Sequence, residues 1–448
     1  MPISARQAAT AVLMTLRQAG HEALFAGGAV RDLLRGEPPH DYDVATSARP
    51  EQVLDLFPHT VAVGAHFGVV VVRYGGHDVE VATFRSEGGY ADGRHPTRVV
   101  YSSARQDVLR RDFTINGLLY DPVTDRVIDY VGGQADLEAG RLRCIGEPDA
   151  RFAEDRLRML RAVRFAVRFD LTVDPDTWAA VQAHASEIGA VSAERIRDEL
   201  LKMLTGPRPA LALVRLQESG LLAAILPEVE ALRGVTQPEA FHPEGDVFEH
   251  TRRVLKHLVP PADAPPWRVE ALFVAALLHD VGKPATWKKT DRVRFHGHAA
   301  VGADLADDIT ERLRLSRRQR TRVRALVADH ARFLDVRKMR TATRLRFLRQ
   351  EHLEDGLALH RADRLAGSGD LTDWQFCREE LERLSEQQLR PAPLLDGHRL
   401  IALGAPRGPA VGRLLRALED AQLEGQLTTV EAAEAWVSEA LARQKEEP

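Results

Sequence analysis

The chain has 448 residues, of which 44% are hydrophobic and 28% are charged, and its formal net charge is −4. This composition indicates a globular protein of several domains. It excludes a disulfide scaffold and a cysteine-rich zinc site, because Cys144 and Cys377 are the only cysteines. The small negative charge means that any contact with nucleic acid must come from local basic patches.

The first twenty residues, MPISARQAATAVLMTLRQAG, have the pattern of an amphipathic helix and are too polar for a signal peptide. No apolar run approaches the length that spans a membrane. Two cysteines in so long a chain suit a reducing compartment. We therefore expect a cytoplasmic protein without a membrane partner.

Residues 1–140 predict a mixed α/β region, because β-branched runs punctuated by glycine follow the first helix. The segment GVVVVRYGGHDVEVATF predicts a hairpin that turns at Gly75 and Gly76. From about residue 141 onward, Arg, Ala and Leu recur at helical spacing and the β-branched runs disappear. The expected fold class is therefore α+β, with a mixed α/β N-terminal region followed by an all-α remainder.

A glycine turn in GGAVRDLLRG follows the apolar run ALFA. Gly27 and Gly28 would let the backbone approach a ligand closely. A helix that starts there offers free N–H groups to phosphate, and Arg31 lies in its first turns. The alternative is a strand–helix turn without a ligand.

Two acids, Asp41 and Asp43, follow in DYDVAT. On a strand, residues i and i+2 project from the same face, so the two carboxylates would repel unless a cation lies between them. Mg²⁺ prefers oxygen ligands and leaves positions open for substrate phosphates. Glu80, on a later predicted strand, is the candidate for a third catalytic carboxylate, and a surface glutamate is the alternative.

The segment LRRDFTINGLLY contributes Arg111, Asp112 and Asn116. The Arg111 guanidinium matches the geometry of phosphate, and Asp112 could accept hydrogen bonds from ribose hydroxyls. Taken alone, the same residues also suit a solvated helix start.

The segment EDRLRMLRAVRF places Asp155 and Arg158 three residues apart, so we expect them on one helix face. A carboxylate only accepts and a guanidinium only donates, so the pair could read the pairing edges of cytosine and adenine and reject guanine and uracil. Arg161 and Arg164 continue the same stripe and could hold phosphates or a primer. A helix salt bridge is the alternative.

These three segments, in this order and spacing, resemble the class II tRNA nucleotidyltransferases, the family of bacterial CCA-adding enzymes and poly(A) polymerases. The resemblance implies a polymerase-β-like nucleotidyltransferase head, a helical neck, a body and a tail, which we place at residues 1–140, 141–205, 206–360 and 361–448. It also implies a tRNA acceptor arm and 3′ end as partner, with CTP and ATP as substrates and release of pyrophosphate.

The resemblance assigns roles to residues of all three segments. It implies that Asp41 and Asp43 are the catalytic Mg²⁺ ligands. It also implies that the nucleotide is bound by Gly27, Gly28, Arg31, Arg111, Asp112, Asn116, Asp155, Arg158, Arg161 and Arg164. Addition of A alone and poly(A) addition remain open within the family. The segment FRSEGGYADGRHPTRVVY resembles a flexible loop that CC-only relatives lack, which disfavours CC-only addition. The sequence leaves the oligomeric state open.

A histidine–aspartate set occurs within a second predicted domain, at about residues 242–335. The order His250, His279-Asp280, His296, His298 and His330 resembles the HD phosphohydrolase superfamily. Imidazole and carboxylate suit a second divalent metal, for which we assign His250, His279 and Asp280, with Asp363 as a further candidate. The competing readings are a metal-dependent phosphohydrolase whose head recruits RNA, and a module that has lost its metal and binds tRNA. A purely non-catalytic RNA-binding protein is disfavoured by Asp41 and Asp43.

The segment ERLRLSRRQRTRVRALV carries seven arginines from Arg312 to Arg324. This is the strongest basic patch of the sequence, and we expect it to contact the phosphate backbone of tRNA.

Overall fold

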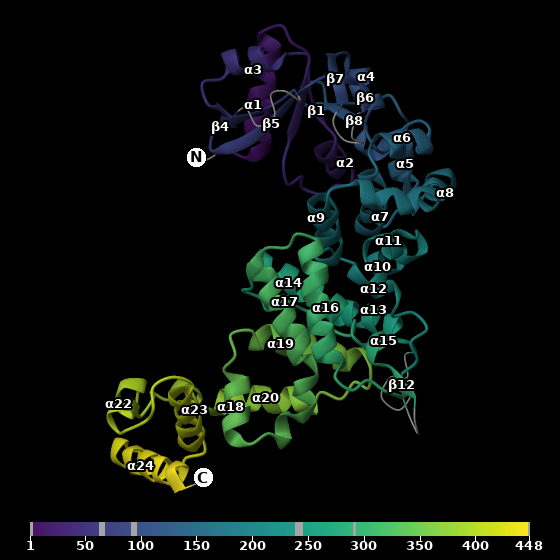
Figure 1. Cartoon of the computed structure of the whole chain (residues 1–448). Coiled ribbons are helices and arrows are strands. Elements are labelled where there is room, and N and C mark those ends of the chain that lie inside the picture. The colour runs from purple at the N-terminus through teal and green to yellow at the C-terminus, as the bar shows by residue number, and fades with distance from the viewer. Residues whose placement is uncertain (1–2, 62–67, 91–95, 238–244, 290–292, 447–448) are drawn as a thin grey trace. The chain divides into compact units, whose positions relative to one another are not determined.

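The computed structural model describes residues 3–61, 68–90, 96–237, 245–289 and 293–446. The chain divides into two compact units, residues 1–227 and residues 228–448. The first unit contains a sheet with helices, and the second is almost entirely helical (Figure 1). The predicted α+β fold class is therefore confirmed. The division into four parts remains a prediction.

A seven-stranded mixed sheet organises the first unit. Its strands, in spatial order, are β3 (Thr60–Val61), β4 (Val69–Tyr74), β5 (His77–Thr83), β2 (Asp43–Thr46), β1 (Ala23–Ala26), β8 (Leu118–Asp121) and β9 (Arg126–Asp129). Strand β2 runs parallel to β5 and antiparallel to β1. Two-stranded pairs are formed by β6 (Arg85–Tyr90) with β7 (Pro96–Tyr101) and by β10 (Arg141–Leu142) with β11 (Thr172–Val173).

Both faces of the sheet are buried at its central strands, β1 and β2. On one face, Phe25 and Val44 pack in a core with the apolar side of α1 (Ala5–Gln18) and with α3 (Pro50–Leu56). On the other face, Leu24 packs with the helix α4 (Ala104–Leu109). Consecutive strand residues point to opposite faces, so a strand covered on both sides is apolar throughout.

The hairpin of β4 and β5 confirms the turn predicted at Gly75 and Gly76. Tyr74 pairs with His77, and the two glycines have φ of 57° and 86°. Positive φ at both central residues is the requirement of a type I′ turn, which glycine meets without strain.

The remaining helices of the first unit follow the sheet or connect its strands. They are α2 (Gly28–Leu34), α5 (Gly133–Glu138), α6 (Pro148–Glu154), α7 (Leu157–Phe169), α8 (Pro175–His184), α9 (Ala193–Leu204), α10 (Pro209–Glu218) and α11 (Leu221–Ile225), with the short 3₁₀ helices η2 (Thr114–Asn116) and η3 (Ala185–Ala190). The helix α12 (Pro227–Glu230) lies at the boundary between the units.

Helices build the second unit, with one short hairpin of β12 (Lys288–Lys289) and β13 (Val293–Arg294). The helices are α13 (Val247–His257), α14 (Pro266–Leu278), α15 (Lys283–Thr286), α16 (His298–Arg312), α17 (Arg317–Asp329), η4 (His330–Lys338), α18 (Thr341–Leu348), α19 (Leu353–Ala366), α20 (Thr372–Arg383), α21 (Glu386–Leu389), α22 (Gly397–Ala402), α23 (Pro409–Leu423) and α24 (Val430–Glu446). The last three share an apolar core of their own. Among the described residues, no helix combines the length and apolarity that crossing a membrane requires.

Candidate functional site

A cavity of about 530 Å³ in the first unit gathers the three sequence segments. Fourteen residues line it, and ten of these are predicted site residues, namely Gly27, Gly28, Arg31, Asp43, Arg111, Asp112, Asn116, Asp155, Arg158 and Arg161. The other four are Arg110, Leu157, Phe165 and Arg195. Of the residues predicted to be catalytic or to bind the nucleotide, Asp41, Glu80 and Arg164 do not line it.

The glycine turn forms one wall of this cavity. Gly27 follows β1 with φ 66° and ψ −124°, a conformation that side-chain-bearing residues rarely adopt, and its N–H donates to the carbonyl of Leu118. A Cβ at Gly27 would lie 2.9 Å from Nη1 of Arg111. The glycine therefore allows the Arg111 guanidinium to lie directly against the backbone.

The acids lie where β2 begins. Asp43 is the first residue of β2 and pairs with Ala26, the last residue of β1. Asp41 precedes the strand and is exposed, so the expectation that both acids lie on a strand is wrong for Asp41. The reason is that β1 ends at Ala26, where the chain turns at Gly27, and leaves Asp41 without a strand partner.

The three acids nevertheless share one electrostatic environment. Burial raises the pKa of Asp43 to about 7, and the negative charges of Asp41 and Glu80 add to this effect. Glu80 belongs to β5, the strand that pairs in parallel with β2. The charge of Arg111 opposes this rise only in part, and three carboxylates gathered in this way favour a bound cation.

Side chains from all three segments form a connected network of hydrogen bonds. Nη1 of Arg31 donates to Oδ1 of Asn116 at 2.7 Å, and Nη2 of Arg111 lies 3.0 Å from Asp107. Asp112 accepts from Nε of Arg161 at 2.7 Å and from the Asn116 amide at 3.0 Å. The hydrogen bond between Arg161 and Asp112 joins α7 to the segment LRRDFTINGLLY, so the second and third segments are held together.

The third segment is not a continuous helix, contrary to the expectation for Asp155 and Arg158. Helix α6 ends at Glu154, Asp155 is extended with φ −148° and ψ 105°, and α7 starts at Leu157. The Asp155 carboxylate accepts from the N–H of Leu157 at 3.1 Å, which satisfies a free donor at the start of α7. Competition from this local hydrogen bond explains why a helical sequence pattern breaks at an aspartate.

Each member of this pair has its own ionic partner. Nη1 of Arg158 lies 2.7 Å from Glu154, and its guanidinium also donates to the carbonyls of Arg151 and Arg110. Asp155 accepts from Arg195 on α9. Arg195 was not predicted, because its segment, AERIRDELLK, has the alternating charges of a solvated helix.

Arg164 is buried and lies outside this cavity. Its Nε lies 2.5 Å from Glu199 of α9, which is itself 3% exposed. Burial lowers the pKa of Arg164, and Glu199 opposes this effect. Helix α9 therefore contributes to two ion pairs, one at the cavity with Asp155 and one beside it with Arg164 of α7.

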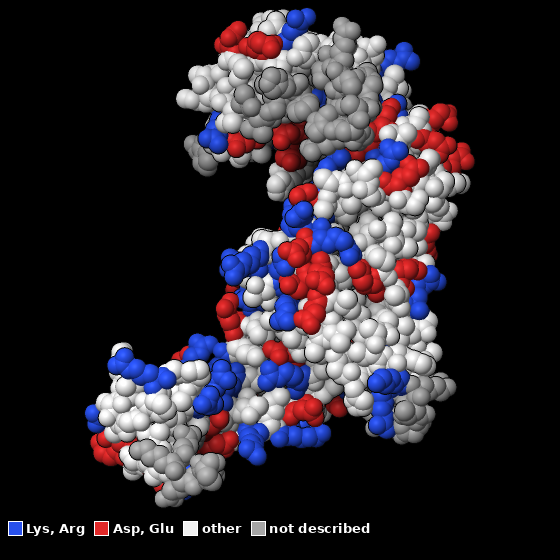
Figure 2. All heavy atoms as spheres, viewed as in Figure 1, with Lys and Arg blue, Asp and Glu red and all other residues white. Residues whose placement is uncertain are grey.

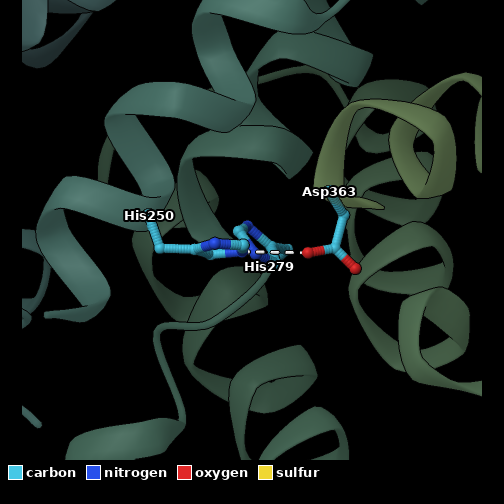
Figure 3. A group of neighbouring side chains, drawn as sticks. All are labelled: His250, His279 and Asp363. Atoms are coloured by element: carbon cyan, nitrogen blue, oxygen red, sulfur yellow. Dashed lines mark hydrogen bonds and ion pairs between the residues drawn. The ribbon is translucent and has the colours of Figure 1, made fainter. Parts of the chain in front are cut away.

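A second cluster of titratable side chains lies in the second unit. His250 of α13, His279 at the end of α14 and Asp363 of α19 point toward one another (Figure 3), and Nε2 of His250 lies 2.9 Å from Oδ1 of Asp363. Asp280, His298 and His330 form an adjacent group of possible metal ligands. These groups include His250, His279 and Asp280 of the predicted set, and His296 is exposed and belongs to neither.

Asp280 connects the two groups. Its carboxylate oxygens lie 3.2 Å from Nε2 of His279, 3.9 Å from that of His250, and 3.6 Å from those of His298 and His330. Although burial alone would raise the pKa of Asp280, the charges of His279 and Lys283 hold it well below its usual range. The carboxylate is therefore available as an anionic ligand.

Backbone carbonyls fix the rings of three of the histidines. Nδ1 of His279 lies 2.8 Å from the carbonyl of Ala276, that of His298 lies 2.8 Å from Phe295, and that of His330 lies 2.7 Å from Val327. Because a carbonyl only accepts, each Nδ1 carries a proton, and in the neutral form of each ring Nε2 presents a lone pair to the cluster. Burial lowers the pKa of His298 to about 4.

The arginine patch from Arg312 to Arg324 is largely neutralised. Ion pairs join Arg312 to Glu228, Arg320 to Asp307, Arg322 to Asp355 and Arg324 to Asp304. In the view of Figure 2, Lys and Arg are interspersed with Asp and Glu over the described surface. The predicted contact of this patch with a phosphate backbone remains a prediction, and these acids compete with phosphate for most of its charge.

Three protein-family models match the chain. The poly(A) polymerase head domain matches residues 23–143, and a probable RNA- and SrmB-binding site of polymerase A matches residues 170–232. The HD domain matches residues 247–368, which include every member of the histidine–aspartate cluster.

Whole-length relatives were found as well. The chain is 32% identical over 432 residues to the CCA-adding enzyme of Lactobacillus johnsonii, a match that covers 95% of each chain. It is 36% identical over 435 residues to the A-adding tRNA nucleotidyltransferase of Deinococcus radiodurans, with 93% of this chain and 94% of that protein covered. The crystal structure of the Bacillus stearothermophilus CCA-adding enzyme in complex with CTP superimposes with a TM-score of 0.74 at 29% identity, over 100% of both chains.

Proposed function

From the membership of this chain in the tRNA nucleotidyltransferase family of CCA-adding enzymes, we infer that it adds C and A to the 3′ end of tRNA, using CTP and ATP and releasing pyrophosphate. The observation that carries this proposal is the single cavity at which residues from all three sequence segments meet. A cavity lined by six arginines and three acids suits a nucleoside triphosphate with a bound cation.

Mg²⁺ is the metal that we propose for the head, held by Asp41 and Asp43 with Glu80 as a third carboxylate. The donors are all carboxylate oxygens, which Mg²⁺ prefers. Burial and the charges of Asp41 and Glu80 raise the pKa of Asp43, and a divalent cation would offset both effects. When bound, such a metal lowers the pKa of an attacking hydroxyl and stabilises the leaving pyrophosphate.

The side chains of the cavity orient the nucleotide in this proposal. Arg31 and Arg111 bind the triphosphate, and Arg111 reaches it because Gly27 has no side chain. Asn116 holds the Arg31 guanidinium in place. Asp112 is proposed to meet the ribose, although its carboxylate also accepts from Arg161 and Asn116, so it fixes α7 as well.

Base choice is assigned to Asp155 and Arg158. The carboxylate accepts from an exocyclic amino group, and the guanidinium donates to a ring nitrogen or carbonyl of the incoming base. Because each side chain is already held by a partner of its own, neither has to be ordered when the nucleotide arrives.

Single-nucleotide incorporation tests the proposed activity. Transcripts of one tRNA that end before the first C, before the second C and before the A are each incubated with one of the four nucleoside triphosphates. We expect CTP to extend the first two and ATP to extend the third. Extension of the third transcript alone would indicate an A-adding enzyme, and long ATP-dependent tails would indicate poly(A) addition. The variant Asp43→Asn is the inactive control.

A divalent metal in the histidine–aspartate cluster is the second proposal. Nε2 of His298 and Nε2 of His330 lie 3.2 Å apart, and when both rings are neutral the proton of each is on Nδ1. Two lone pairs that face each other at this distance repel unless a cation lies between them. The buried Nε2 of His279 likewise makes no hydrogen bond within the described residues. Phosphohydrolase activity at this metal is the corresponding candidate function.

Metal analysis of the purified protein tests this second proposal. We expect about one or more transition-metal ions per chain, lost in His279→Ala, and a melting temperature that falls when a chelator removes them. A metal content that is the same in the variant would contradict the assignment. We further propose the cytoplasm as the setting of both activities.

A further inference from the structure

A second cavity, of about 230 Å³, lies between α7 and α9 in the first unit. Val167 and Met203, each 3% exposed, form its buried apolar wall, and Pro207 of the following loop contributes to it. Its charged lining residues are Arg164, Arg168 and Lys202, and no acid lines it.

The positive charge of this cavity is only partly compensated. Glu199 lies 2.5 Å from Arg164 and 3.6 Å from Lys202, so one carboxylate serves two cations. Arg168 is exposed, stacks over the ring of Phe169 at 4.9 Å and makes no ion pair within the part of the chain that the structure describes. Burial lowers the pKa of Arg31, and the charges of Arg168 and Arg164 add to that effect. The surroundings therefore carry more positive charge than their own acids balance.

The two cavities lie on neighbouring faces of α7. Arg161 and Phe165 line the nucleotide cavity, and Arg164 and Arg168, each three residues later, line the second one. Arg31 lines the first cavity, and its guanidinium lies 4.2 Å from the ring of Phe169, over which Arg168 of the second cavity also stacks. From Arg161 to Arg168 the helix rises about 10 Å, at roughly 1.5 Å per residue. A nucleic-acid strand that rises roughly 3.4 Å per nucleotide would cover this distance in about three nucleotides.

We propose that the second cavity binds the sugar–phosphate backbone of the RNA just upstream of its 3′ end. Arg168 and Lys202 would contact a phosphate, and Val167, Met203 and Pro207 would contact a ribose or base. The proposal rests on the proposed function and adds a binding site for the primer strand that is separate from the nucleotide cavity. A strand anchored there is held with its last nucleotide directed along α7 toward the triphosphate.

Binding of RNA without nucleotide tests this proposal. The probe is a tRNA transcript that ends before the A, and its dissociation constant is measured at several salt concentrations for the wild type, Arg168→Gln, Lys202→Gln and Arg168→Lys. Each Gln variant is expected to bind roughly 2- to 5-fold more weakly, as for a partly exposed charge pair. The slope of log K against log salt should also decrease by about 0.7 for each lost contact with a single strand. Arg168→Lys should retain most of the RNA affinity and most of the salt slope.

The matched control is Arg215→Gln, which removes a charge from α10 of the same unit at a side chain 47% exposed and outside both cavities. It should leave RNA binding and its salt slope unchanged. Affinity for CTP or ATP without RNA should be the same in all variants.

Three results would overturn the proposal: unaltered RNA affinity in both Gln variants, an equal loss in Arg215→Gln, or a loss of nucleotide affinity in place of RNA affinity. The last would mean that the cavity binds free nucleotide or phosphate. If the wild type binds and extends RNA and the Gln variants have the same RNA affinity, only the site at the second cavity is refuted. A wild type that neither binds nor extends RNA refutes the proposed function itself.

Discussion

Arg195 holds Asp155 through two nitrogen atoms, with Nη2 2.7 Å from Oδ2 and Nη1 3.2 Å from Oδ1. A residue of α9 thereby fixes the carboxylate that lies in the break between α6 and α7. A carboxylate has about four lone-pair positions, so this contact leaves positions free for a base. Asp155 and Arg158 are thus positioned by different partners, Arg195 and Glu154, and not by each other.

Arg158→Ala should relax the choice of base and slow addition. A bidentate contact contributes roughly 1–3 kcal/mol of discrimination against the wrong base, by analogy with groove readout in duplexes. The ratio of correct to incorrect incorporation should therefore fall roughly tenfold to hundredfold in single-turnover assays with all four nucleotides. Arg156→Ala, which removes a neighbouring arginine paired with Glu187, is the control. Unchanged selectivity with a lowered melting temperature would mean that Arg158 only stabilises the helix.

Asp43→Asn should abolish nucleotide addition and leave the fold intact. Loss of one metal ligand should remove several kcal/mol of transition-state stabilisation, because the metal stabilises the leaving pyrophosphate. The raised pKa of Asp43 shows that its charge is unfavourable without a cation, so the neutral variant should melt no lower than the wild type in EDTA at pH 8. Asp55→Asn, at an exposed acid of α3, should change neither property. Near wild-type addition by Asp43→Asn would refute the metal assignment.

Gly27→Ala should weaken nucleotide binding and lower stability. The φ of 66° costs about 1–3 kcal/mol for a residue with a side chain, and the new Cβ would displace the Arg111 guanidinium. The Michaelis constant for CTP and ATP should therefore rise. Gly36→Ala separates the two effects, because Gly36 has φ 72° but no atom within 4 Å of its Cβ position. A similar rise in both variants would show that Arg111 is not the cause.

His184 should make stability depend on pH. Its hydrogen bond with Glu187 is the main cause of its raised pKa, and Asp149 contributes through a second one. A histidine whose pKa is higher in the folded state stabilises fully below the unfolded value of 6.5 and loses this effect as pH rises through the folded value. The melting temperature of the wild type should exceed that of His184→Gln more at pH 5.5 than at pH 8.5. An equal difference at both pH values would contradict this.

The double variant His279→Ala, Asp280→Ala should retain nucleotide addition. Both residues belong to the cluster of the second unit, whereas every residue of the nucleotide cavity belongs to the first. Phosphatase and phosphodiesterase activities should be absent, together with the bound metal. A folded double variant, with a wild-type circular dichroism spectrum, that fails to extend tRNA would show that the cluster contributes to transfer.

Much of the fold and most of the cavity could be predicted because their signals are local. The glycine turn at Gly27 and the hairpin at Gly75 follow from φ angles that other residues avoid. The family resemblance is confirmed by relatives that match nearly the whole chain. Ten of the predicted residues meet at one cavity, whereas their individual roles remain predictions.

The features that could not be predicted depend on contacts between distant segments. Arg195 meets Asp155 forty positions earlier, and the acids that neutralise the arginine patch come from other helices. Asp363 was a candidate ligand, but its contact with His250, 113 residues away, was not predicted, and our division of the chain placed it in the tail. The break at Asp155 depends on one side-chain hydrogen bond, which competes with a helical pattern on both sides of it.

His279 and His330 both occupy the position directly after a helix, and each ring donates to a carbonyl of the helix's last turn. Those carbonyls lack partners within their own helices, so each ring acts as a C-terminal cap. The hydrogen bond that caps the end of α14 or α17 is consequently the same one that places a proton on Nδ1 of His279 or His330. A chain that has folded these two helix ends has therefore also fixed which nitrogen of each ring faces the cluster.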